Sequence, residues 1–137
     1  MSESLRKLCA VLTGVIVSLL VVSGIESIGH IVYPPPEVMD LSDSVMLRKD
    51  VSTLPVGAFV FVLVAWVFGT VLGGMVACVI ARKRPRVYSR IIGGVMLLLS
   101  TMNMLYIPHP LWFSVIAVAL ILAATVWVGS LNRWWGK

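Results

Sequence analysis

The chain has 137 residues, of which 59% are hydrophobic and only 12% are charged. A soluble domain is about 45–50% apolar and about 25% charged, so this chain has too few charges for a water-facing surface and too many apolar residues for disorder. The net charge is +5, and five of the eleven Lys and Arg lie together between two long apolar segments. That placement indicates membrane topology rather than nucleic-acid binding, and the length suggests one membrane domain whose main partner is the lipid bilayer.

The first predicted span runs from Leu8 to Val32 and follows a short charged start. It is longer than the apolar region of a signal peptide, about 7–15 residues, and no Ala-x-Ala cleavage site follows it. We therefore expect a retained helix. Three prolines, residues 34–36, end it because proline lacks the backbone N–H that a helix needs.

An outer loop is predicted from Pro34 to Leu54. Within it, residues 41–49 are expected to form a short helix on the membrane surface, with Asp40 or Ser42 as the residue that caps it.

Three further spans are predicted at residues 55–81, 87–107 and 111–131. Each holds about 20 or more residues, which is the length needed to cross about 30 Å of hydrocarbon. A helix satisfies its own backbone hydrogen bonds in lipid, so helices are expected rather than isolated strands. The predicted fold class is an all-α membrane protein, a bundle of four transmembrane helices.

Charge gives the predicted orientation of the four spans. With four crossings, the amino terminus, the basic loop 82–90 and the carboxyl terminus lie on one side of the membrane. These three regions hold Arg6, Lys7, Arg82, Lys83, Arg84, Arg86, Arg90, Arg133 and Lys137. The outer loop holds more acidic than basic residues. The positive-inside rule therefore predicts that both termini are cytoplasmic.

Glycines of the second and third spans carry the predicted helix-packing signal. Gly69 and Gly73 have the Gly-x3-Gly spacing, Gly74 is beside them, and Gly93 and Gly94 begin the next span. Small residues let helix backbones approach closely in lipid. The pattern is compatible with contact inside one bundle or with a homodimer or larger membrane complex.

Polar residues in the outer half of the bundle form the predicted site. Glu26 is the one acidic residue well inside a span, and His30 and Tyr33 continue its helix face. Asn103 lies at a similar depth in the third span, and His109 lies in the outer turn at about the level of His30. A charge at such a depth usually faces a bundle interior or a wet cavity. We therefore expect these five residues to form a polar pocket that opens outward.

Three interpretations of this pocket remain open. In the first, the group is structural and fixes helix register, because buried polar groups in lipid need partners. In the second, Glu26 loads and releases a proton or cation and His30 relays it. In the third, Glu26, His30 and His109 bind a metal ion, since Glu-x3-His places two ligands on one helix face. Trp66, in mid-span, is interpreted as a packed or lipid-facing aromatic.

Motifs of catalysis are missing from the sequence. It shows no nucleophile–base pair, phosphate loop or zincin motif, which indicates no cofactor and favours a non-enzymatic role. Cys9 and Cys78 are not spaced as Cys-x-x-Cys and are expected to be free thiols.

Two runs of sequence carry a resemblance: Glu26-Ser27-Ile28-Gly29-His30-Ile31-Val32-Tyr33-Pro34-Pro35-Pro36 and Asn103-Met104-Leu105-Tyr106-Ile107-Pro108-His109-Pro110-Leu111-Trp112-Phe113. Together they resemble a group of small bacterial four-helix membrane proteins of unassigned function. The resemblance implies a bacterial cytoplasmic (inner) membrane and the same four spans, and it implies no activity.

The architecture is also similar to that of small multidrug-resistance transporters, which have four helices and a glutamate in the first. Here the glutamate lies further along its helix and the outer loop is longer. The function we expect is a small transport or permeation protein with a protonatable site at Glu26 and His30. The alternatives are a non-catalytic accessory or scaffold subunit and a metal-binding membrane protein.

Overall fold

The computed structural model describes residues 2–34, 42–82 and 85–131, and these residues form helices without any strand. The helices are α1 (Glu3–Val32), α2 (Ser44–Thr53), α3 (Val56–Ala81), α4 (Pro85–Tyr106) and α5 (Leu111–Ser130). Four of them, all except α2, are long and apolar enough to cross a membrane. The predicted all-α fold with four spans is confirmed, and the chain has the form of a multi-pass membrane protein.

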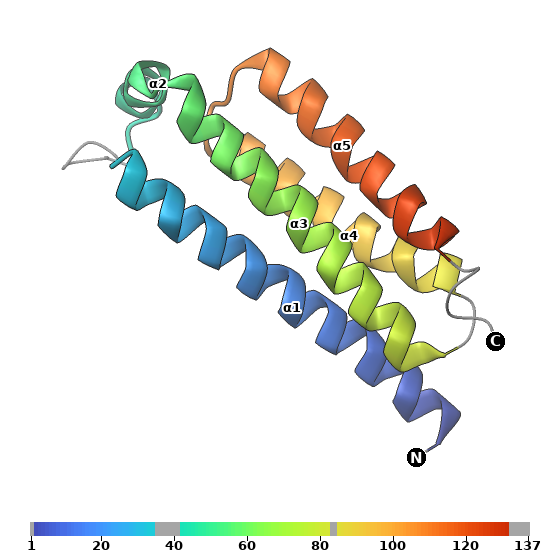
Figure 1. Cartoon of the computed structure of the whole chain (residues 1–137). Helices are drawn as coiled ribbons and strands as arrows, with labels where there is room; N and C mark the ends of the chain where they lie inside the picture. The colour runs from blue at the N-terminus through green and yellow to red at the C-terminus, as the bar shows by residue number, and fades with distance from the viewer. Residues whose placement is uncertain (1, 35–41, 83–84, 132–137) are drawn as a thin grey trace.

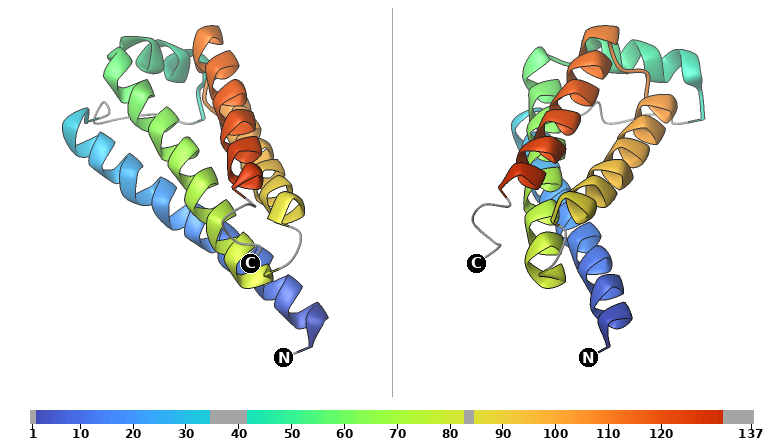
Figure 2. Two further views of the ribbon diagram at one scale, coloured as in Figure 1. Left: turned by 45° about the vertical axis from the view of Figure 1, so that its right-hand side comes forward. Right: turned by 90° about the vertical axis from the view of Figure 1, so that its right-hand side faces the viewer.

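Helix α3 is the centre of the bundle (Figure 1). It contacts α1 along most of its length and also contacts α4 and α5. Helices α4 and α5 pack on each other, while α1 touches α4 only to a small extent. The described ends of the chain lie at one end of the bundle, and α2 crosses the opposite end (Figure 2). The bundle therefore has a termini end and an α2 end, names that we keep below.

Helices α1 and α4 extend further than predicted at the termini end. Helix α1 begins at Glu3 rather than Leu8, because the Ser2 hydroxyl accepts a hydrogen bond from the backbone N–H of Leu5 at 3.3 Å and caps it. Helix α4 begins at Pro85, a residue that suits the first turn of a helix. The predicted loop 82–90 is thus too long, and its last residues are helical.

The surface helix was predicted a few residues too early. Helix α2 is capped by Asp43, whose carboxylate accepts hydrogen bonds from the N–H groups of Val45 at 2.9 Å and Met46 at 3.3 Å. The predicted cap at Ser42 is wrong, and Asp40 lies outside the described residues. Leu47 and Val51, one turn apart, are the buried residues of α2. Burial of this pair fixes where the helix lies on the bundle.

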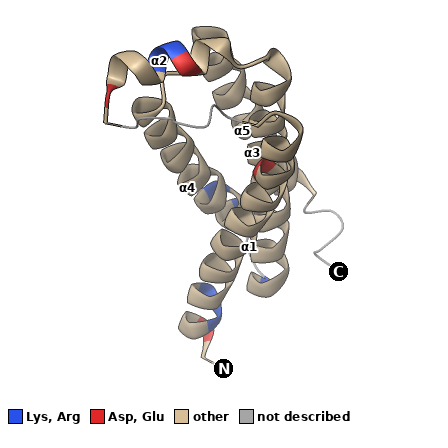
Figure 3. Cartoon of the chain, turned by 90° about the vertical axis from the view of Figure 1, so that its left-hand side faces the viewer, with Lys and Arg blue, Asp and Glu red and all other residues tan. Residues whose placement is uncertain are grey.

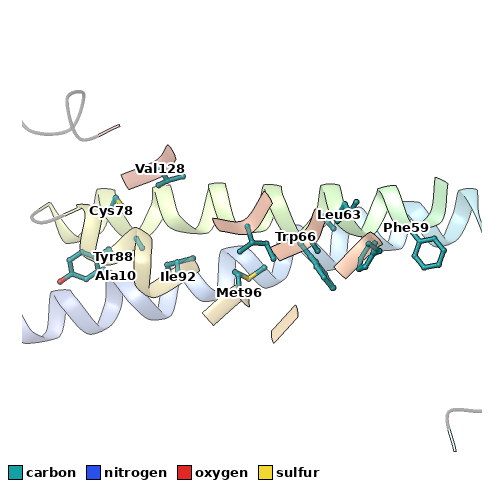
Figure 4. Close-up of a cluster of buried hydrophobic side chains, with 14 of the residues drawn as sticks. Ala10, Phe59, Leu63, Trp66, Cys78, Tyr88, Ile92, Met96 and Val128 are labelled. Carbon is teal, nitrogen blue, oxygen red and sulfur yellow. The ribbon is translucent and has the colours of Figure 1, made fainter. Parts of the chain in front are cut away.

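Aromatic and aliphatic side chains from α3, α4 and α5 fill the core (Figure 4). Trp66 lies near the middle of α3, with a ring centroid 5.5 Å from that of Phe113. Ile92, Met96 and Ile121 are almost fully buried in the same core. Large apolar side chains also cover the outside of the spans, among them Leu20, Leu98 and Val115. An apolar exterior of this kind suits lipid.

Small residues bring α1 and α3 into close contact. An ideal Cβ at Gly69 would lie 2.7 Å from the Val22 side chain of α1. A Cβ at Gly73 would overlap the Ser18 side chain and the Gly14 carbonyl. Gly14 and Ser18 have the same i, i+4 spacing on α1 as the two glycines on α3. The Gly-x3-Gly face is therefore used inside this chain.

The other predicted packing glycines divide into two groups. A Cβ at Gly74 would meet the Val128 side chain at 3.3 Å, and a Cβ at Gly93 would overlap Thr125, so both face α5. Gly94 is exposed, and a Cβ there would meet nothing within 4 Å. Gly94 packs on none of the described helices, because only Gly93 of this adjacent pair points at α5, and its use in a dimer face stays a prediction.

Candidate functional site

A cavity of about 270 Å³ lies at the α2 end of the bundle. Its walls come from the last turns of α1, the first turns of α3, the end of α2 and the turn between α4 and α5. The lining residues are Glu26, Gly29, His30, Tyr33, Val51, Leu54, Ala58, Phe59, Phe61, Val62, Ile107 and His109. Four of the five residues of the predicted pocket thus share one cavity, and the rest of its wall is apolar or aromatic.

Glu26 lies on the wall formed by α1 and is half-buried. Its carboxyl accepts a hydrogen bond from the indole N–H of Trp66, and the charge of His30 attracts it. His30 is four residues along the same helix and more exposed. The pair therefore places a carboxyl and an imidazole on one wall, with the imidazole nearer the end of the helix.

Tyr33 closes the end of α1. Its backbone N–H donates to the Gly29 carbonyl at 2.8 Å, and its ring meets that of Phe61 edge-on with centroids 6.0 Å apart. Its hydroxyl lies against Gly57, where an added Cβ would overlap it. The missing side chain at Gly57 is what lets the phenol ring lie across the first turn of α3.

His109 enters the cavity from the turn between α4 and α5. Its Nδ1 lies 2.7 Å from the Ile107 carbonyl oxygen. A carbonyl only accepts, so Nδ1 carries the proton and Nε2 is left as an acceptor. The ring stacks on Phe113 with centroids 4.6 Å apart and an interplanar angle of 17°. Burial lowers the pKa of His109 and the Ile107 hydrogen bond opposes that effect, so the imidazole is neutral at pH 7.

Asn103 is not among the residues that line the cavity. It lies in the last turn of α4, where its backbone carbonyl accepts a hydrogen bond from the N–H of Ile107 at 2.8 Å. Helix α4 packs mainly on α3 and α5 and has little contact with α1. Equal depth in the membrane therefore did not bring Asn103 to Glu26, because depth does not say which neighbours a helix has.

Metal binding at this cavity has no support in the geometry. Within residues 2–34, 42–82 and 85–131, no group of three His, Cys, Asp or Glu side chains is placed to hold a metal ion. Glu26, His30 and His109 share the cavity without converging as ligands. A metal ion held by these three residues therefore stays a prediction.

Sequence reasoning gave Trp66 too small a role. Its side chain is buried, and its indole lies between the Glu26 carboxyl and the rings of Phe113 and His109. A signal was present in the sequence: an indole N–H in mid-span needs an acceptor. Glu26 is the only carboxyl well inside a span, which makes it the natural acceptor.

The chain matches no protein-family model, no curated protein and no solved structure. The resemblance carried by the two sequence runs and the similarity of architecture to small multidrug-resistance transporters therefore remain predictions.

Proposed function

We propose that the chain is a small membrane transport or permeation protein, in which the cavity at the α2 end takes up protons at Glu26 and His30. The observation that carries this proposal is the position of Glu26: a carboxyl on the wall of an otherwise mainly apolar cavity, next to an imidazole. Ionisable groups inside membrane spans commonly mark ion pathways and proton relays.

The dimensions of the cavity favour a small ligand. Its volume of about 270 Å³ is at the lower end of ligand pockets, which hold about 300–1,000 Å³. A proton with its water, or a small cation, fits this space better than a large substrate does. The neutral imidazole of His109 adds an acceptor nitrogen on the far wall.

A structural role is the competing proposal, and one contact favours it. The hydrogen bond from Trp66 to the Glu26 carboxyl joins α3 to α1, as a group that fixes helix register would. In that case the chain is an accessory or scaffold subunit, and its polar cluster only holds the bundle together.

The variant Glu26→Gln separates the two proposals. Glutamine has nearly the shape of glutamate and keeps an oxygen that can accept from Trp66, but it cannot exchange a proton. Purified protein in liposomes with an imposed pH gradient is followed with an enclosed pH-sensitive dye. We expect the parent to pass protons, and Glu26→Gln to fold with normal yield and fall to the rate of empty liposomes.

The matched control is Glu3→Gln, which removes the same charge at the other end of α1, where Glu3 pairs with Lys7 at 3.1 Å. It should leave the flux unchanged. A parent protein with no flux, or a Glu26→Gln variant with parental flux, excludes the proton site. The scaffold proposal instead predicts that Glu26→Gln is silent while Glu26→Ala lowers the melting temperature.

The same proposal includes a location and an orientation. The described basic residues are mostly at the termini end (Figure 3), and the positive-inside rule puts that end in the cytoplasm. We propose the inner membrane of a bacterium, both termini cytoplasmic and the Glu26 cavity facing outward. The partners proposed are lipid and, in a homodimer or larger complex, further membrane proteins.

A further inference from the structure

A second cavity of about 270 Å³ lies between α4 and α5 at the termini end. Its lining residues are Arg86, Arg90, Thr125, Val126, Gly129 and Ser130. The helices come close there, because a Cβ at Gly129 would lie 3.6 Å from the Arg86 backbone and the Ser89 hydroxyl donates to the Thr125 carbonyl. The cavity is therefore bounded by rigid helix walls on both sides.

The two arginines give this cavity its charge. Arg86 and Arg90 are four residues apart, so both guanidinium groups lie on one face of α4. In the described ranges, neither arginine forms an ion pair with a carboxylate, and the ion pair at this end joins Lys7 to Glu3. Two adjacent unpaired guanidinium groups favour an anion from outside the protein, and phosphate is the anion that their fork geometry fits best.

Exposed apolar surface continues from the arginines toward the membrane interior. Gly94 is one turn beyond Arg90 on the same face of α4, and a Cβ there would meet nothing within 4 Å. On α5, Val126 lines the cavity, and Leu122 is one turn further in; both are exposed apolar residues. An acyl chain can lie along such a surface, whereas a soluble phosphate ion would gain no binding energy from it.

We propose that this α4–α5 cavity binds an anionic phospholipid, with its phosphate at Arg86 and Arg90 and an acyl chain along the exposed apolar surface at Gly94, Leu122 and Val126. Phosphate is the chemistry that the arginines recognise, and the apolar surface beside them selects a lipid as its source. Basic pockets between membrane helices bind anionic headgroups in this way. The inference is independent of the proton site, which lies at the opposite end of the bundle.

The test measures retention of single lipids on the full chain by native mass spectrometry from detergent, with phosphatidylglycerol and phosphatidylcholine compared at equal concentration. We expect the parent to retain one phosphatidylglycerol much more strongly than phosphatidylcholine. Arg90→Gln should weaken retention of phosphatidylglycerol about tenfold, because it removes a charge-assisted hydrogen bond to the phosphate; a tenfold loss corresponds to about 1.4 kcal/mol.

Two further variants keep the result interpretable. Arg82→Gln removes the same charge at the same end of the bundle but outside the cavity, and should retain phosphatidylglycerol like the parent. Gly94→Leu places a bulky side chain where the acyl chain would lie without changing charge, in open space where the helix should still fold, and should weaken retention. A melting temperature near the parental value shows that each variant is folded.

Other outcomes overturn the proposal. Equal retention of the two lipids by the parent would mean that the cavity does not recognise the anionic headgroup. Equal loss in Arg82→Gln and Arg90→Gln would mean that only bulk charge attracts the lipid. Displacement of phosphatidylglycerol by millimolar inorganic phosphate, together with normal retention in Gly94→Leu, would assign the arginines to a soluble phosphate instead.

Discussion

His109 is the residue through which the dependence of stability on pH can be measured most directly. Burial holds its pKa below the ordinary value of 6.5. Above pH 6.5 the imidazole is neutral in the folded and unfolded states and makes no pH-dependent contribution. As the pH falls, the unfolded chain takes up the proton first, so stability falls until the pH has passed the lowered pKa.

We therefore predict that the melting temperature in detergent falls between about pH 7 and pH 5, and that His109→Phe removes part of this fall. Phenylalanine keeps a ring to stack on Phe113 but has no proton to exchange. Glu26 and His30 share the cavity with His109, Arg48 lies beside it in a neighbouring cavity, and all three are unchanged in the variant. The difference between the two curves isolates His109, and parallel curves would contradict the prediction.

At the scale of the elements, α1 and α3 depend on small residues. Gly73→Val should lower stability by about 1–3 kcal/mol, the usual penalty for overpacking, because its side chain would overlap Ser18 and the Gly14 carbonyl. Gly94→Ala is the matched control in open space and should stay within about 0.5 kcal/mol of the parent. Thermal unfolding in detergent measures both. A silent Gly73→Val would mean that α1 and α3 do not pack as described.

Helix α2 depends on its cap as well as on the burial of Leu47 and Val51. Asp43→Ala removes two hydrogen bonds to backbone N–H groups and should destabilise the helix by about 1 kcal/mol. Hydrogen exchange of the α2 amides should then speed up about fivefold, while the spans stay protected. Asp50→Ala, in the same helix but away from the cap, should leave exchange slow, and equal effects of the two changes would contradict the capping role.

Across the whole molecule, the sequence was sufficient for features that depend on one segment and insufficient for those that depend on neighbours. The four spans follow from runs of apolar residues, and the Glu26–His30 pair follows from helical spacing. The position of Asn103 does not follow, because it depends on α3 separating most of α4 from α1. Whether Gly94 packs inside the chain does not follow either, because the rotation of a helix about its axis is set by the helices it touches.

Placing the termini end in the cytoplasm is the last prediction, and charge is its only basis. Of the described basic residues, Arg48 and Lys49 lie on α2 at one end, and the remainder lie at the other. In a Cys9→Ser, Cys78→Ser background, single cysteines at two exposed serines can be compared: Ser52→Cys on α2 and Ser4→Cys at the start of α1.

Serine at position 78 keeps a donor for the Pro85 carbonyl, which Cys78 contacts at 3.2 Å, so the background should fold. A membrane-impermeant maleimide added to intact spheroplasts should label Ser52→Cys and leave Ser4→Cys unlabelled until the cells are lysed. The reverse pattern would turn the Glu26 cavity toward the cytoplasm, because that cavity and α2 lie at the same end of the bundle. Labelling of both sites in intact cells would contradict a single orientation, since the positive-inside bias is expected to fix one.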